Sequence, residues 1–139
     1  MQVVSYLTFN GDCREAMKFY HKCLGGKLDI MTVGESPMSN NMPVKMKNTI
    51  LHALLKNKKL VIMGSDMVGE KGLVKGNSVA LMLDVKTEKE MRDLFRKLSK
   101  GGVVGHKIER AFFGGLLGDF TDKFGVNWVM HCKEKKQTK

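Results

Sequence analysis

The chain has 139 residues, 42% of them hydrophobic and 27% charged, a composition that suits one folded domain and is too apolar for a disordered chain. The formal net charge is +10, but the lysines are scattered, with no RNP-like aromatic motif or zinc-finger spacing beside them. We therefore expect no nucleic-acid partner. The apolar runs are too short to span a bilayer, so we expect no membrane partner either.

The N-terminus and the cysteines point to the same compartment. The first residues lack the charged region and the long apolar region of a signal peptide. The three cysteines form no C-x-x-C pair and are odd in number, which is typical of a reducing environment. We expect a cytoplasmic protein.

The first half of the sequence predicts one helix among four strands. The β-type runs are 3–9, 28–33, 49–55 and 60–63. The helix begins after Asp12 and ends at the pair Gly25-Gly26, where a left-handed residue ends a helix at low cost. Asp12 and Glu15 have the spacing of a capping box, so we expect the Asp12 side chain to cap the helix.

The second half predicts the same pattern. Its β-type runs are 78–85, 103–108, 116–120 and 126–131, and its helix runs from Thr87 to the pair Gly101-Gly102. Thr87 and Glu90 form the second capping box, 75 residues after the first. The basic segment 133–139 follows as a tail.

The apolar stripes of the two helices repeat at the same interval. Ala16, Phe19, Tyr20 and Cys23 correspond to Met91, Leu94, Phe95 and Leu98. Each half therefore reads β-α-β-β-β. We predict an α+β fold in which residues 1–139 form a single domain of two repeated modules, about 1–70 and 76–133.

Three stretches of sequence carry a family resemblance: "YLTFNGDCREAMKFY", "ILHALL" followed by "LVIMGSD", and "DKFGVNW". Together they resemble the PhnB-like branch of the vicinal oxygen chelate superfamily, which includes glyoxalase I, fosfomycin- and bleomycin-resistance proteins and extradiol dioxygenases. The resemblance implies the glyoxalase/bleomycin-resistance/dioxygenase fold, with eight strands in two curved sheets and two main helices. It also implies a homodimer with ligand pockets between modules.

The resemblance further implies where a divalent metal would bind. Superfamily members place His or Glu ligands on the first, fourth, fifth and eighth strands. In this chain those positions fall on Ser5, near Met63, on Ser78 and on Val129. Methionine and valine do not bind such ions and serine binds them weakly, so we expect no metal and no other cofactor.

Eight residues are candidates for lining a ligand pocket: Ser5, Leu7, His52, Met63, Ser78, Asn127, Trp128 and Val129. His52, inside an apolar strand, either lines the pocket or is a hydrogen-bonded structural histidine. Trp128 either belongs to the core or faces the cavity. For His21, His106 and His131 we expect a solvated surface position.

Three further features leave two interpretations open. Cys13, in the first turn of a helix, is a core or incidental cysteine, which we favour, or a reactive thiol. The methionine-rich segment 34–49 is an arm that packs on a partner subunit, which we favour, or a lid over a pocket. Phe112 and Phe113 form a mobile aromatic gate or a hydrophobic plug beside a bulge.

Three functions are therefore compatible with the sequence. We favour a metal-free protein that holds a small, partly apolar molecule between its modules. The alternative is an enzyme, either with a metal site displaced toward His52 or cofactor-free. Methyl transfer, which some family members carry as a label, has the least support because no glycine-rich nucleotide loop opens a helix. A nucleic-acid-associated protein would rest on charge alone.

Overall fold

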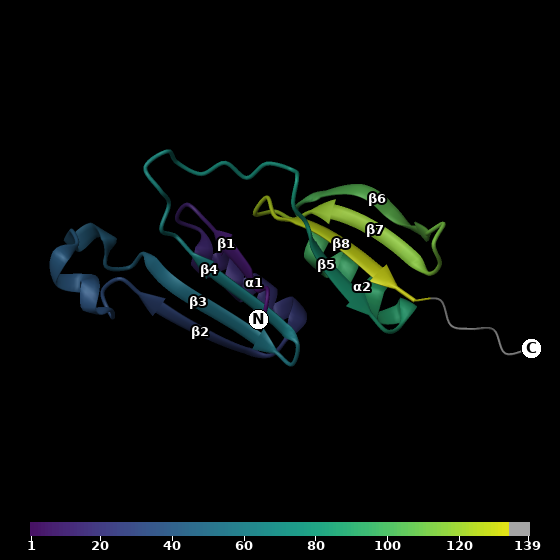
Figure 1. The fold of residues 1–139 in the computed structure, drawn as a ribbon, viewed down its shortest axis with the longest axis horizontal. Coiled ribbons are helices and arrows are strands. Elements are labelled where there is room, and N and C mark those ends of the chain that lie inside the picture. Colours follow the sequence, from purple (N-terminus) through teal and green to yellow (C-terminus); the bar gives the residue numbers. More distant parts are fainter. Residues whose placement is uncertain (134–139) are drawn as a thin grey trace, which may run out of the picture. The chain divides into compact units, whose positions relative to one another are not determined.

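The computed structural model describes residues 1–133 and divides the chain into two compact units, 1–74 and the part from Lys75 onward (Figure 1). The expected basic tail lies outside the described residues, apart from Lys133. Each unit has the order β-α-β-β-β, so the predicted repeat and the α+β fold of eight strands and two helices are confirmed.

The first unit is a four-stranded mixed sheet with one helix. Its elements are β1 (Ser5–Thr8), α1 (Cys13–Leu24), β2 (Lys27–Thr32), the 3-10 turns η1 (Pro37–Asn41) and η2 (Val44–Met46), β3 (Ile50–Asn57) and β4 (Leu60–Ser65). The strand order is β1-β4-β3-β2, with β1 parallel to β4 and the other pairs antiparallel.

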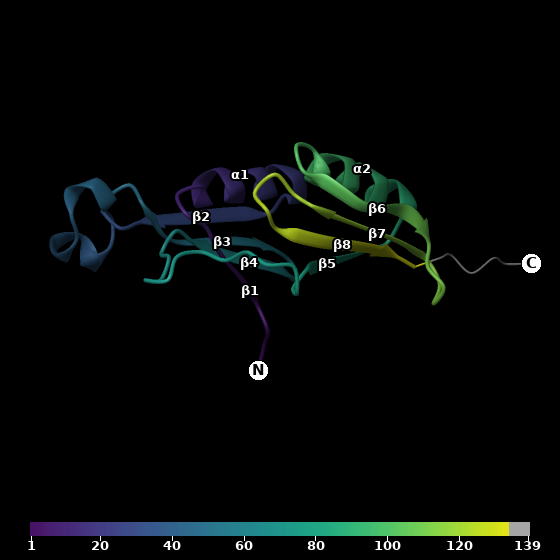
Figure 2. The same ribbon diagram turned by 90° about the horizontal axis from the view of Figure 1, so that it is seen from above.

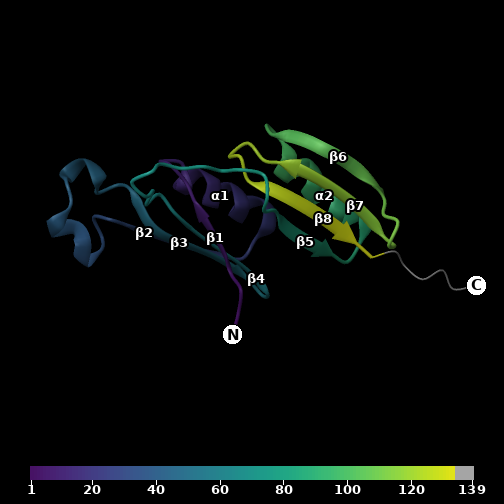
Figure 3. The same cartoon turned by 45° about the horizontal axis from the view of Figure 1, so that its top comes forward.

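The second unit repeats this topology. Its elements are β5 (Leu81–Val85), α2 (Glu88–Ser99), β6 (Val103–Arg110), β7 (Leu116–Thr121) and β8 (Asn127–Cys132). The strand order is β5-β8-β7-β6, and Figure 3 shows β5 and β6 at opposite edges of this sheet. No described helix is long and apolar enough to cross a membrane.

Each helix covers one face of its own sheet and leaves the other face without a helix (Figure 2). In the first unit, α1 buries Cys13, Ala16, Met17 and Tyr20 against Ala53, Leu55 and Ile62 of the sheet. Gly64 allows this close approach, because a Cβ there would lie 3.2 Å from both the Cys13 and the Met17 sulfur. Burying these apolar side chains gives the unit its core.

The core of the second unit is built in the same way. The helix α2 buries Met91, Phe95 and Leu98, and the sheet contributes Phe120, Trp128 and Met130. The Phe95 and Phe120 rings meet edge to face with centroids 5.0 Å apart, and Phe120 stacks on Trp128 at 6.5 Å. Such aromatic packing adds to the apolar burial that holds α2 on its sheet.

The two helices begin differently. The Thr87 hydroxyl accepts a hydrogen bond from the Glu90 amide at 3.1 Å, as its capping box predicts. Asp12 makes no such bond, so this prediction was wrong. Thr87 has the extended backbone that a capping side chain needs (φ −127°, ψ 150°), whereas Asp12 does not (φ −109°, ψ 16°).

A residue distant in sequence caps α1 instead. Asp66, directly after β4, accepts hydrogen bonds on Oδ1 from the amides of Gly11 (2.9 Å) and Cys13 (3.0 Å). Its Oδ2 accepts from the Ile50 amide at 3.3 Å. One carboxylate thus joins the start of the helix, the start of β3 and the end of β4.

The "DKFG" turn before β8 is held by a buried carboxylate as well. Asp122 Oδ1 accepts from the amides of Phe124 (2.8 Å) and Val126 (3.1 Å), and Oδ2 accepts from the Trp128 indole nitrogen at 2.8 Å. Gly125 takes the positive φ (+85°) that the turn requires. The aspartate of this motif is therefore structural.

We expect Asp66→Ala to lower the free energy of unfolding by about 2 kcal/mol or more, because three main-chain donors lose a charged acceptor. Asp12→Ala is the matched control and should change it by less than about 0.5 kcal/mol. Urea titrations of both variants measure the difference. Equal effects of the two substitutions would contradict the capping role of Asp66.

Candidate functional site

The strand registers assign every side chain of the first sheet to one of two faces. Residues paired directly across strands share a face, and neighbours along a strand alternate. Because Leu55 and Ile62 are buried beneath α1, their cross-strand partners lie on the helix face. The residues between them lie on the opposite face, which we call the first open face.

An apolar row crosses the first open face. Tyr6 pairs with Met63, Met63 with Leu54, and Leu54 with Asp29. His52 lies on the same face, two residues from Leu54, and its ring centroid is 6.3 Å from that of Tyr6. Among residues 1–133, the ring nitrogens of His52 have no hydrogen-bond partner. The interpretation of His52 as a hydrogen-bonded structural histidine is therefore not supported.

Two predicted site residues of β1 lie on the other face. Ser5 pairs with Ile62, and Leu7 pairs with Gly64, both under α1. Tyr6, 56% exposed, pairs with Met63 on the open face, and it was not among the predicted site residues. The alternation of apolar Leu7, polar Thr8 and apolar, buried Phe9 could have indicated it, because apolar residues at every second position mark the covered face.

The second sheet has an open face built by the same logic. Val129 pairs with Met82 and with Asp119, and Asp119 pairs with His106. In the neighbouring row, His131 pairs with Asp84 and with Leu117. This second open face therefore places two carboxylates and two imidazoles around an apolar centre.

The two histidines of the second open face differ in exposure. The His106 ring is 85% exposed, as we predicted, and its Nδ1 lies 2.8 Å from Asp119 Oδ2. The prediction was wrong for His131, whose side chain is only 15% exposed. Its Nδ1 bonds to Asp84 Oδ1 and its Nε2 to the Gly114 carbonyl, both at 3.2 Å, which ties the 111–115 loop to the sheet.

The remaining predicted site residues of the second unit have structural contacts or lie outside a strand. Trp128 is 1% exposed and lies in the core beneath α2, on the side of β8 opposite to Val129. Asn127 donates to the carbonyls of Gly76 (3.3 Å) and Val79 (3.1 Å). These bonds hold the segment before β5, so Ser78 lies in an exposed loop and β5 begins at Leu81 rather than at residue 78.

The residues at the superfamily's metal positions do not fit a metal ion. Ser5 lies on the helix face, Ser78 in a loop, and Met63 and Val129 offer no hard donor. Within residues 1–133, no three His, Cys, Asp or Glu side chains are arranged to hold a metal, around His52 or elsewhere. We therefore derive no chemistry through a metal here.

Cys13 is a core thiol. It is fully buried at the start of α1, and burial, followed by the nearby Asp66 and Asp12 carboxylates, raises its pKa from 9.0 to about 12. Of the two interpretations of Cys13, the reactive thiol is therefore wrong. Desolvation and neighbouring negative charge outweigh the helix dipole at this position.

A shallow depression beside α2 is part of the solvated surface. It is lined by Thr87, Lys89, Glu90, Arg92, Asp93 and Arg96. Its charges pair with one another along the helix, with Arg92 3.0 Å from Glu88 and Lys97 3.0 Å from Asp93. The hydrogen bond from Lys97 lowers the pKa of Asp93. Such exposed pairs make a hydrated helix face and no ligand site.

Comparison with known proteins identifies the family of this chain. The family described as 3-demethylubiquinone-9 3-methyltransferase matches residues 1–131. The chain belongs to this family.

Three known proteins match the chain over nearly its whole length. Protein YjdN of Escherichia coli is 29% identical over 99% of both chains. The crystal structure of PA1353 from Pseudomonas aeruginosa is 36% identical, covers 96% of this chain and 98% of its own, and has a TM-score of 0.82. The PhnB protein from Bacillus cereus is 25% identical, with coverage of 95% and 99% and a TM-score of 0.72.

A more distant structure has a similar fold. A glyoxalase/bleomycin resistance protein/dioxygenase family enzyme from Burkholderia phytofirmans is 13% identical, with coverage of 94% and 98% and a TM-score of 0.64. This likeness is one of fold alone. The resemblance that the three sequence stretches predicted is thereby confirmed at the level of family and fold.

The thiol of Cys13 should make stability depend on pH in the alkaline range. Its pKa is higher in the folded chain than in the unfolded chain, so its contribution is full below pH 9.0 and decreases as pH rises toward about 12. We expect wild type to lose more stability than Cys13→Ala between about pH 8 and pH 10.5. Urea titrations at both pH values measure this, and parallel losses would contradict it.

Proposed function

We propose that this PhnB-like protein binds a small, partly apolar molecule without a metal ion. The observation that supports this most directly is the first open face. There Tyr6, Met63 and Leu54 present a continuous apolar row to the side of the sheet that α1 leaves uncovered. Ligand sites in proteins are mostly apolar, with a few polar groups that orient the ligand.

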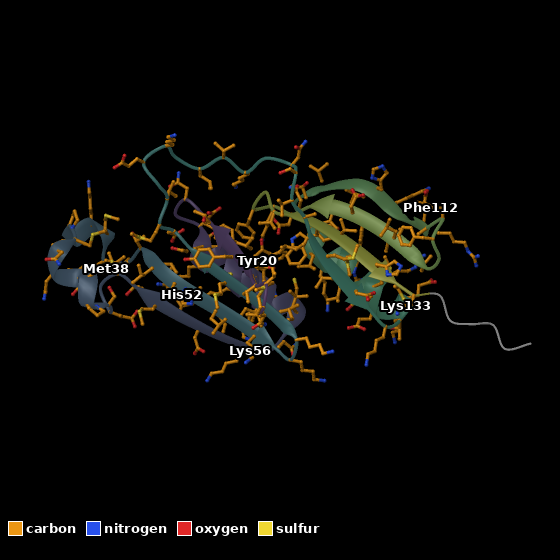
Figure 4. The ribbon with its side chains drawn as sticks, in the orientation of Figure 1. Tyr20, Met38, His52, Lys56, Phe112 and Lys133 are labelled. Carbon is orange, nitrogen blue, oxygen red and sulfur yellow. The ribbon has the colours of Figure 1, made fainter. Side chains whose placement is uncertain are left out.

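His52 supplies the polar group that such a site needs. It lies beside the apolar row, its ring faces that of Tyr6, and Figure 4 shows it on β3. A neutral imidazole offers one donor and one acceptor, so His52 can bind a hydroxyl, a carbonyl or an acidic group of a ligand. Tyr6 can add a stacking surface and a phenolic hydroxyl.

The metal-free form of the proposal rests on the side chains at the inherited metal positions. Met63 and Val129 occupy the open faces there, and both are packing residues. Binding through shape and a few polar contacts needs no Lewis acid.

Methyl transfer is not the activity that we propose, despite the description of the family. Nucleotide-type cofactors commonly use free amides at the start of a helix that follows a strand. At the junction of β1 and α1, the amides of Gly11 and Cys13 already donate to the Asp66 carboxylate. The sheets are also small and mixed rather than doubly wound.

The test is ligand binding by wild type and His52→Ala. A thermal-shift screen of small aromatic, hydroxamate and diketone compounds should find ligands that stabilise wild type. We expect His52→Ala to weaken their affinity about tenfold, equivalent to one lost polar contact of about 1.4 kcal/mol. His21→Ala, on α1 and away from the open face, is the matched control and should bind like wild type.

Two results would count against this function. No stabilisation by any compound would remove the support for a binding site. Elemental analysis of protein purified without added metal should find no stoichiometric divalent ion. A bound ion that is lost in His52→Ala would favour the alternative of a metal enzyme with a displaced site.

We also propose that the chain forms a homodimer through the arm, residues 34–49. The base of the arm is closed by main-chain hydrogen bonds, from the Gly34 amide to the Lys47 carbonyl and from the Val33 amide to the Thr49 carbonyl, both 2.9 Å. Beyond this base the arm exposes Met38 (40%) and Val44 (78%), and Figure 4 shows Met38 at η1. An ordered segment with exposed apolar side chains fits a contact surface.

Light scattering coupled to size-exclusion chromatography tests the dimer. Wild type should have twice the mass of the chain, and the double variant Met38→Lys/Val44→Lys should shift to the monomer. Val74→Lys, which is also exposed but lies outside the arm, should remain a dimer. A monomeric wild type, or a dimeric arm variant, would contradict the proposal.

A further inference from the structure

Two lysines face each other on the first open face. Lys27 at the start of β2 pairs directly with Lys56 near the end of β3, and Lys56 pairs with Val61 of β4. Both lysines are exposed, and Lys56 is marked on β3 in Figure 4. Directly opposed residues have Cβ atoms only about 5 Å apart, so the two ammonium groups share one small region of the face.

Without a bound anion, the repulsion between the Lys27 and Lys56 ammonium groups destabilises the sheet. Like charges directly opposite one another destabilise a sheet. Within residues 1–133 neither lysine has a carboxylate within ion-pair distance, although Asp29 lies on the same face two residues from Lys27. An anion held between the lysines would relieve the repulsion and gain two charge-assisted hydrogen bonds.

The turn beside the pair adds to the positive potential. Lys58 and Lys59 connect β3 to β4 and are both exposed. Lys58 has a φ of +55°, the left-handed conformation that glycine or asparagine adopts at less cost. The sequence therefore carries lysine at a backbone position where other residues fit better.

The lysine pair continues the apolar row toward one end of the sheet. Lys56 lies two residues from Leu54 and four from His52, which is about 13 Å along the strand at 3.3 Å per residue. The first open face thus has a polar ring at one end, an apolar middle and a cationic pair at the other. This order matches a molecule with an apolar body and an acidic end.

We propose that the first open face binds an amphipathic organic anion. Its apolar or aromatic body lies on Tyr6, Met63 and Leu54, and its acidic group lies between Lys27 and Lys56. The acidic group is a carboxylate or a phosphoryl group, because the compact charge of lysine suits either. This proposal rests on the function proposed above and adds the chemical class of the ligand.

The experiment compares three probes that share one apolar body: 2-naphthoate, 2-naphthyl phosphate and the neutral 2-naphthamide. Calorimetric titration at neutral pH and low salt measures their affinities for wild type, Lys27→Glu and Lys56→Glu. Lys18→Glu, exposed on α1, has the same change in net charge and is the control. The control separates a local site from the overall charge of +10.

We expect wild type to bind at least one acidic probe about tenfold more tightly than the amide. Lys27→Glu and Lys56→Glu should reduce this preference to about twofold or less, whereas Lys18→Glu should keep most of it. Lys27→Glu should also unfold at the same temperature as wild type or higher, because opposite charges then face each other across the strands. Which acid binds more tightly identifies the acidic group.

Three outcomes would overturn the inference, and they differ in what else they overturn. If the amide binds wild type as tightly as the acids, the anionic class is wrong and the proposed function stands. If the acid preference survives in both Lys27→Glu and Lys56→Glu, the anion binds elsewhere. If no probe binds and the compound screen above also finds no ligand, the proposed function fails together with this inference.

Discussion

In each unit, one aspartate carboxylate accepts hydrogen bonds from donors that the sheet leaves unpaired, and the rest of the unit depends on it. Asp66 holds the amides of Gly11, Cys13 and Ile50, and Asp122 holds those of Phe124 and Val126 together with the Trp128 indole. A buried donor without an acceptor is costly, so these contacts fix how each helix or turn joins its sheet. The side chains on the open faces of the sheets are therefore not needed to join the helix or turn to the sheet, and they can serve in binding.

The stretches that carry the family resemblance therefore contain two kinds of residue, those that hold the fold together and those that face the open side of a sheet. The stretches "LVIMGSD" and "DKFGVNW" contain these two aspartates, whose carboxylates are occupied by the amide and indole donors named above. They identify the fold because the fold requires them. Tyr6, His52 and Met63 belong to the same family stretches, but they occupy the alternate strand positions that lie on the first open face.

The candidate site was only partly visible from the sequence. His52 and Met63 were predicted, and the register places both on the first open face. Tyr6 and the Lys27–Lys56 pair were missed, because cross-strand neighbours depend on a register that local sequence does not specify. Trp128 was a candidate, although it lies in the core, because an aromatic side chain in a strand can pack in a core or line a cavity equally well.

The sequence by itself determined the repeat, the types of the elements and the positions of both helices, because apolar periodicity and glycine stops are local signals. It also determined the family, since "DKFGVNW" and the other quoted stretches are continuous in the sequence and can be recognised without the structure. Only the tertiary structure decided which face of each strand α1 or α2 covers, and that Asp66 rather than Asp12 caps α1. The physical reason is that strand alternation defines two faces but does not say which one a helix will bury, and a cap can come from any residue that folding brings near.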